Sequence, residues 1–290
     1  MTQTTRPATD RAALPALARH EIKRYARHPL FLVGVVLTTA ACALGPDEGS
    51  SLGHVIVPAM TLGVFGLLVM VSMVRGSDQA HEAAGTVVAS ERTRTLALAL
   101  STVVPFVAGL LFFAWAVWAY HAEPPGAGTV PFGDVGDGWA YAVLFALGTI
   151  STVGGPILGL VIGRWLPFRG AGIVSSVLLI MLTIVFQGIV EPLRYVRVFM
   201  PWTYFGGPYG VDGDPQRWVI LTGSPFWYCL YLVALCAIGV VIALLHDREQ
   251  PRLPLLRVLM VLGVVAVVLF VLSMTTGVQE VMVNPLPGKA

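Results

Sequence analysis

The sequence predicts an all-α integral membrane protein: a polytopic bundle of six to seven transmembrane helices, preceded by an amphipathic helix at the membrane interface. Of the 290 residues, 56% are hydrophobic and only 12% are charged, whereas soluble domains carry about 25% charged residues. The apolar residues also gather into runs near the roughly 20 residues that a spanning helix needs. Helices are expected instead of a barrel, because the runs lack barrel-type alternation and lipid cannot satisfy unpaired backbone groups.

Seven apolar runs approach the length of a spanning helix. They lie at 30–46, 53–74, 95–120, 139–163, 170–190, 225–245 and 254–274. The first run is the shortest of the seven. The chain therefore divides into a cytoplasmic N-terminal region (1–29), a transmembrane domain (30–274) and a C-terminal tail (275–290).

The basic residues indicate how the chain is oriented. If seven spans alternate from a cytoplasmic N-terminus, 14 of the 18 Lys and Arg residues fall on the inner side. Such a bias is the positive-inside signal. We therefore expect the N-terminus in the cytoplasm, together with the connections 75–94, 164–169 and 246–253. If all seven spans are real, the C-terminus lies outside.

The N-terminal region carries a helical pattern between Ala12 and Arg27. Apolar side chains recur at helical spacing at Leu14, Leu17, Ala18, Ile22 and Tyr25, whereas Arg19, Lys23, Arg24 and Arg27 fall largely off this stripe. The pattern predicts a basic amphipathic helix at the inner membrane surface, with Pro29 beginning the first span. The alternative is an ordinary basic flank that only fixes topology.

No catalytic, metal-ligating or cofactor-binding residue emerges from the sequence. His81-Glu82 begins an H-E-x-x-H zinc motif, but Gly85 stands where the second histidine is needed. Cys42, Cys229 and Cys236 fall inside predicted spans without metal-binding spacing. A GxxxxGK[ST] phosphate loop is missing, and a nucleophile elbow, which needs a strand-to-helix turn on an α/β-hydrolase sheet, is not expected in a chain of apolar helical runs. Nucleic-acid binding is not expected either, because the positive charge follows the membrane face.

The interiors of the spans bear on the mechanism. None of the predicted spans carries an ionisable residue at its centre, which weakens the prediction of an ion-coupled transporter. Gly155, Gly159 and Gly163 form a GxxxGxxxG ridge on the fourth span. Small residues at this spacing predict close helix packing, either within the chain or between subunits.

The connection at 75–94, RGSDQAHEAAGTVVASERTR, is longer than a turn between adjacent spans requires. Two short helices broken at Gly85 fit its pattern. They would present charged side chains to the cytoplasm.

Three features together carry a resemblance to a known family. A basic amphipathic helix runs into the first span through Arg27-His28-Pro29-Leu30, the connection after span two reads Glu82-Ala-Ala-Gly85-Thr86, and Arg92-Thr-Arg94 leads into span three. With this layout, residues 12 to about 246 resemble the permease subunit of type-2 ABC transporters, particularly actinobacterial versions. Two departures stand out. Ala89-Ser90-Glu91 occupies the place of a frequent Thr/Ser-Pro pair, and 254–274 adds a seventh span to the usual six.

The resemblance implies a transport subunit and not an enzyme. Its partners would be a separate cytoplasmic ATPase, which would hold ATP and Mg, a second copy or a related permease, and membrane lipids. The chain would lie in the bacterial cytoplasmic membrane, and the segment Glu191–Ser224 would supply short interfacial helices outside. By the same resemblance, the residues that couple to the ATPase would be Glu82, Gly85, Thr86, Arg92 and Arg94.

Two other function classes remain open. One is a non-transporting membrane anchor or assembly subunit that recruits a cytoplasmic partner through the same face. The other is an integral-membrane enzyme for lipid or polyprenyl substrates, which would need acids or histidines converging at one interface.

Overall fold

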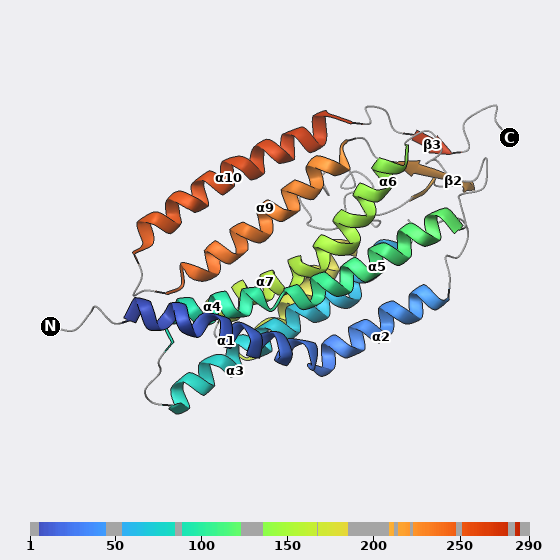
Figure 1. Ribbon diagram of the computed structural model, residues 1–290. Helices are drawn as coiled ribbons and strands as arrows, with labels where there is room; N and C mark the ends of the chain where they lie inside the picture. The colour runs from blue at the N-terminus through green and yellow to red at the C-terminus, as the bar shows by residue number, and fades with distance from the viewer. Residues whose placement is uncertain are drawn as a thin grey trace.

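The structure, a computed structural model, describes residues 6–44, 54–84, 89–122, 136–166, 168–184, 209–211, 214–220, 223–247, 251–277 and 282–284. Helices dominate it and form an elongated bundle (Figure 1). In chain order the helical elements are α1 (Arg6–Ala26), α2 (Pro29–Ala43), the π-helical turn η2 (Ala59–Gly63), α3 (Val64–Ala84), α4 (Glu91–Leu100), α5 (Val103–Ala122), α6 (Gly136–Phe145), the π-helical turn η4 (Ala146–Ile150), α7 (Ser151–Trp165), α8 (Ala171–Ile184), α9 (Pro225–Leu244) and α10 (Arg252–Thr275).

A small antiparallel sheet accompanies the helices, which the all-α prediction did not include. Its strands are β1 (Tyr209–Val211), β2 (Asp214–Ile220) and β3 (Met282–Asn284), in the order β1-β2-β3. The β-branched and aromatic residues in these stretches favour extended backbone. In the predicted outer segment the described residues are therefore mainly strands, while the expected interfacial helices at 192–205 lie outside the described residues.

Five helical segments are long and apolar enough to cross a membrane: Ala59–Ala80, Glu91–Ala122, Asp137–Trp165, Pro225–Leu244 and Arg252–Thr275. A sixth crossing results if α1 and α2, which meet at a bend of 55°, count as one broken span. These segments match the predicted multi-pass organisation. At 15 residues α2 is about 22 Å long, shorter than the roughly 30 Å of a bilayer core. The described part of α8, with 14 residues, is also short.

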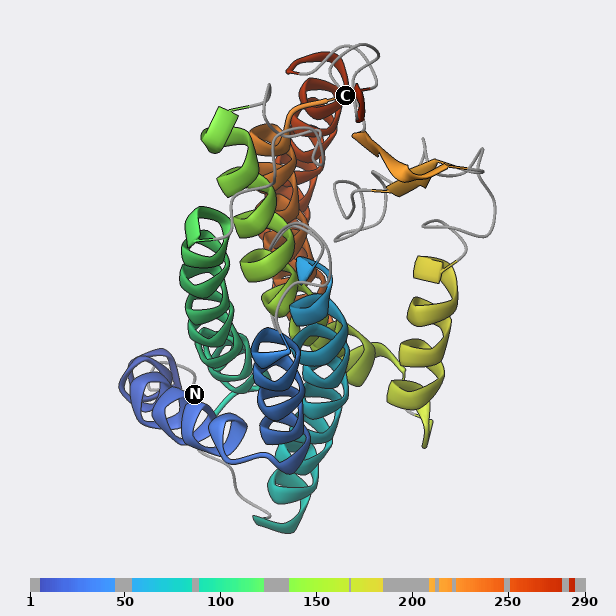
Figure 2. The same cartoon turned by 90° about the vertical axis from the view of Figure 1, so that its right-hand side faces the viewer.

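Two of these segments lie at the centre of the bundle. The apolar stretch of Ala59–Ala80 is 61% buried and that of Asp137–Trp165 is 72% buried. The apolar stretch of Arg252–Thr275, which is α10, is only 6% buried. Among the described elements α10 packs mainly on α9, and α8 stands at the side of the bundle (Figure 2). The contact between α3 and α7 therefore lies in the core of the bundle, whereas α10 belongs to its outer layer.

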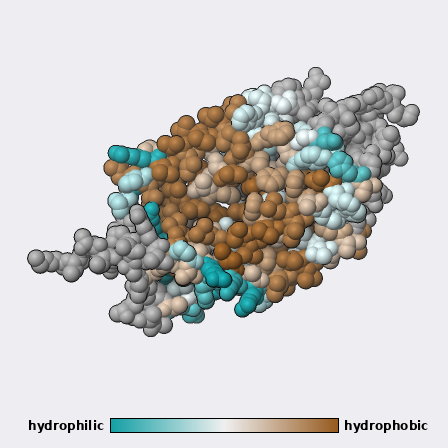
Figure 3. Space-filling model, viewed as in Figure 1, coloured by the Kyte–Doolittle hydropathy of each residue, from teal (hydrophilic) through white to brown (hydrophobic). Residues whose placement is uncertain are grey.

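On the face seen in Figure 3, the described surface is apolar over the middle of the molecule and more hydrophilic towards its two ends. Large apolar side chains are exposed on peripheral helices, for example Leu111 at 69% and Val264 at 65%. In water such a surface would be unfavourable, but lipid tails are as apolar as these side chains. The distribution is compatible with a polytopic membrane protein.

Two predicted N-terminal features are confirmed. Pro29 begins α2 and His28 is its N-cap, with Nδ1 accepting a hydrogen bond from the Leu30 N–H at 3.3 Å. The predicted stripe of α1 turns inward: Ala18 and Tyr25 are buried, whereas Arg19, Lys23 and Arg27 are exposed. The partner of α1 is mainly α4 of the same chain.

Candidate functional site at the α1 end

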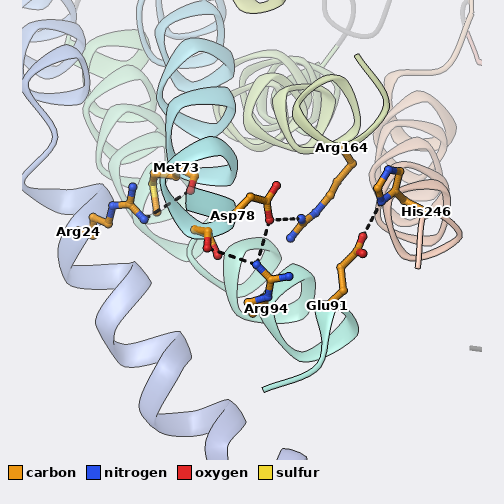
Figure 4. A network of polar contacts seen from close by, with 8 residues as sticks. Arg24, Met73, Asp78, Glu91, Arg94, Arg164 and His246 are labelled. Carbon is orange, nitrogen blue, oxygen red and sulfur yellow. Dashed lines mark hydrogen bonds and ion pairs between the residues drawn. The ribbon is translucent and has the colours of Figure 1, made fainter. Parts of the chain in front are cut away.

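One end of the bundle gathers the charged residues that the sequence singled out. We call it the α1 end; there α1 crosses the bundle, α3 ends, α4 begins, and α7 and α9 end (Figures 1 and 4). Here the predicted 75–94 segment connects two spans. It is the candidate functional site.

The segment differs from the expected pair of separate short helices. Its first part is a direct continuation of α3, which ends at Ala84, and residues 85–88 lie outside the described residues. Alanine, glutamine and glutamate in this stretch are good helix formers, so the helix continues beyond the apolar segment that ends at Ala80. The second part is α4, whose N-cap Ser90 accepts a hydrogen bond from the Thr93 N–H at 3.3 Å.

The predicted coupling residues have different environments. Glu82 on the last turn of α3 and Arg92 on the first turn of α4 are exposed. Arg94 is buried, with only 9% of its surface exposed. Gly85 and Thr86 lie outside the described residues. Glu82 and Arg92 are thus accessible to a partner, whereas Arg94 contacts the chain itself.

Arg94 belongs to an ion-pair cluster centred on Asp78 (Figure 4). The carboxylate oxygen Oδ1 of Asp78, on α3, accepts hydrogen bonds from Arg94 Nη1 at 2.9 Å and from Arg164 Nη1, on α7, at 2.8 Å. Arg94 Nη1 also donates to the Ser77 carbonyl at 3.3 Å. One carboxylate therefore joins the ends of α3, α4 and α7.

A second pair extends the connection to α9. The Nδ1 atom of His246 lies 2.5 Å from Glu91 Oε1 (Figure 4). The Trp165 indole N–H donates to the Ile242 carbonyl at 3.0 Å, and the Trp165 ring meets the His246 ring edge-on with centroids 5.4 Å apart. The first turn of α4 is thereby fixed to the ends of α7 and α9.

Arg24 fastens α1 to the same end of α3. Its Nη1 atom donates to the Met73 carbonyl at 3.4 Å and pairs with Glu21 Oε2 at 3.3 Å. The guanidinium lies over Gly76, where an added Cβ would come within 2.2 Å of Arg24 Nη2. A glycine at this position leaves room for the arginine, which holds α1 against the segment.

The predicted glycine ridge packs within the chain. A Cβ added at Gly155 would lie 1.9 Å from the Gly63 carbonyl oxygen, and one at Gly159 would lie 2.4 Å from the Leu67 carbonyl oxygen. At Gly163 it would meet the Val74 side chain at 2.9 Å. The ridge therefore brings α7 into close backbone contact with η2 and α3, along the helix that carries Asp78.

Sequence reasoning missed Asp78, Arg164, His246 and Arg24 as members of one network. Arg164 counted only as an orientation signal, Arg24 counted as an orientation signal and as a basic residue of the N-terminal amphipathic helix, and Asp78 lies in a polar stretch without a motif. The available signal was the presence of both acids and arginines in connections predicted to share a side of the membrane.

The described residues hold no group of three or more His, Cys, Asp or Glu side chains that fits a metal ion. The three cysteines are free thiols. A scan against protein-family models, a search of curated proteins and a search of solved structures each found no match.

Proposed function

We propose that the chain is the membrane-spanning permease subunit of an ATP-binding-cassette exporter, which forms a translocation path and couples to a separate cytoplasmic ATPase. The observation that carries this proposal is the Asp78-centred cluster. A partner that moves the 75–94 segment through exposed residues such as Glu82 and Arg92 would displace α3 and α4, and through Arg164 it would also displace α7. This is the mechanical connection that a coupling segment requires.

The contact surface for the ATPase is assigned to Glu82 and Arg92, because both are exposed at the α1 end. Arg94 transmits movement from this surface, since its guanidinium is occupied by Asp78 and Ser77. Gly85 and Thr86 join the surface only through the resemblance. ATP and Mg belong to the partner, and a second permease completes the complex.

The proposed topology places the α1 end in the cytoplasm of a bacterial cell. The positive-inside bias supports this orientation. If the short helix α8 also crosses the membrane, seven crossings from α2 to α10 put the C-terminus outside. Reporters fused to the two termini should be active on opposite sides of the membrane; activity on the same side would rule out this topology.

Reconstitution tests the function. The chain and its ATPase, sought among the products of neighbouring genes, are incorporated into proteoliposomes, and ATP hydrolysis and transport of candidate substrates are measured. Arg92→Glu should reduce stimulated hydrolysis at least about tenfold, as expected for lost charged contacts at a docking surface. Arg257→Glu is the matched control, because Arg257 is exposed on α10 and has no assigned role.

The alternative of a non-transporting anchor predicts a different result. An anchor would bind the ATPase through the same surface, and Arg92→Glu would weaken this binding. No nucleotide-dependent movement of any tested substrate would accompany it. If the Arg92→Glu variant stimulates ATP hydrolysis as the original chain does, Arg92 does not belong to the ATPase contact surface. This result would contradict that surface for an exporter and for an anchor alike.

A further inference from the structure

Arg164 has donors that the cluster does not use. Only its Nη1 atom bonds to Asp78, while Nε and Nη2 are buried without a hydrogen-bond partner among the described residues. These two N–H groups lie on the same edge of the guanidinium plane. This edge matches two oxygens of one oxyanion, which is the bidentate geometry for which arginine is favoured.

Arg94 adds to this excess of donors. Its Nε atom is also buried without a partner within the described part of the chain. The side chains of Arg164 and Arg94 are only 2% and 10% exposed. A buried donor without a hydrogen-bond partner destabilises the fold, so the cluster is incomplete as a purely structural element.

The charge of the cluster is also incomplete. Two guanidinium groups share one carboxylate, which leaves one net positive charge at a buried position. Further cations lie exposed at the same end, on Arg92 and Arg169. A multiply charged anion gains more from this potential than a carboxylate does.

We propose that Arg164 and Arg94 form a binding site for a phosphate group at the α1 end, with Asp78 at its opening. The Arg164 Nε and Nη2 atoms donate to two phosphate oxygens, and Arg94 Nε supplies a third donor. The Asp78 side chain is 41% exposed, so Asp78 lies at the solvent-exposed edge of the cluster. The site does not depend on the transport proposal.

Binding is coupled to a change in the helix ends. Because the free edge of Arg164 is buried, the end of α7 must move from α3 and α4 before phosphate can enter. Bound phosphate then stabilises the state in which the end of α7 has moved away from α3 and α4, since a ligand shifts an equilibrium towards the state that it binds better. We expect faster amide hydrogen exchange in the last turn of α7 when the site is occupied.

The phosphate group has two sources, a lipid headgroup or a soluble phosphate compound, and two arms of one experiment distinguish them. In the first, the full-length chain in neutral detergent is titrated with inorganic phosphate at constant ionic strength. Binding is followed by calorimetry and hydrogen exchange, and chloride serves as the comparison anion. In the second, the chain in phosphatidylcholine nanodiscs with added phosphatidylglycerol is examined by native mass spectrometry for retained lipid.

Arg164→Lys is the decisive variant, because it keeps the charge and removes the two-donor edge. It should weaken binding at least about tenfold, as expected for lost charge-assisted hydrogen bonds. The matched control Arg257→Lys should bind as the original chain does. If Arg164→Lys fails to fold, competition on the unmodified chain by sulfate, and not by chloride, provides the same test of oxyanion geometry.

Saturable binding of inorganic phosphate that Arg164→Lys loses would support a soluble ligand. Retention of phosphatidylglycerol alone, again lost in Arg164→Lys, would support a lipid headgroup. The proposal is overturned if neither is bound, or if Arg164→Lys and Arg257→Lys bind equally. None of these results bears on ATP-driven transport, so the two proposals fail separately.

Discussion

A single carboxylate oxygen on Asp78 accepts hydrogen bonds from arginines on two other helices. Asp78→Asn keeps the shape and one oxygen acceptor but removes the charge that offsets two buried guanidinium groups. Because hydrogen bonds to charged groups contribute about 1.5–3 kcal/mol, we expect the free energy of unfolding to fall by about 2 kcal/mol.

Reversible unfolding in mixed detergent micelles measures this effect. Glu82→Gln makes a comparable change on the same helix, at an exposed side chain with no ion pair among the described residues. It should leave stability nearly unchanged. Equal stability of both variants would mean that the Asp78 ion pairs contribute nothing to the α1 end.

His28 gives the junction of α1 and α2 a pH dependence. Burial, followed by repulsion from the Arg24 cation, lowers the pKa of His28 below its ordinary value. The unfolded chain therefore takes up this proton before the folded chain, so stability falls as the pH drops from about 7 to about 5. Protonation also removes the Nδ1 acceptor for the Leu30 N–H.

Hydrogen exchange at the start of α2, measured across this pH range, checks the prediction. Protection should decrease at low pH in the original chain. Asn is a good N-cap that does not titrate, so His28→Asn should show a flatter dependence. A profile that His28→Asn leaves unaltered would assign the titration to another group.

The sequence was more informative about single residues at element boundaries than about residues that meet across helices. Proline at position 29 predicted where α2 begins, because proline suits the first helical turn. Asp78 and Arg164 are 86 residues apart, and their contact depends on how α3 and α7 pack. The sequence identified Arg94 as a basic residue of the 75–94 connection. Only the fold shows that Arg94 is buried and paired with Asp78.

Among the elements, the contact of α7 with η2 and α3 depends on small residues. Gly155→Ala would force a methyl group against the Gly63 carbonyl, because the backbone atoms cannot rotate away as a side chain can. Overpacking of this kind typically costs about 1–3 kcal/mol. We expect a loss of stability in that range.

Gly263→Ala is the matched control, because a Cβ added at Gly263 on α10 meets no atom within 4 Å. Thermal unfolding in detergent should be unchanged for Gly263→Ala and shifted to lower temperature for Gly155→Ala. If both variants unfold at the temperature of the original chain, the close approach of α7 to η2 is not required.

Hydrophobic runs predicted the central elements well, since length and composition are enough to identify a spanning helix. They did not reveal the internal breaks. Pro105 has no N–H for the Ser101 carbonyl, and the Ser101 and Thr102 hydroxyls donate to the Leu98 and Ala99 carbonyls at 2.6 and 2.7 Å. Such local competition separates α4 from α5, although the composition of the run is continuous.

The whole molecule has a central layer of well-buried helices and an outer layer that includes α10. Its exposed charged side chains lie mainly towards the ends, and the α1 end connects five helices through polar contacts: α1, α3, α4, α7 and α9. A protein that docks at this end can therefore affect most of the bundle at once. Composition predicted the membrane class, but this connectivity required the fold.

Site-specific photo-cross-linking in cells can identify the protein that contacts Arg92, and it requires neither a known substrate nor a purified partner. A photoreactive amino acid replaces Arg92, and in a parallel strain it replaces Arg257. Mass spectrometry then identifies the captured proteins. We predict that position 92 captures an ABC ATPase and that position 257 does not. Capture of no ATPase at position 92, or equal capture at both positions, would show that Arg92 is not part of an ATPase contact surface.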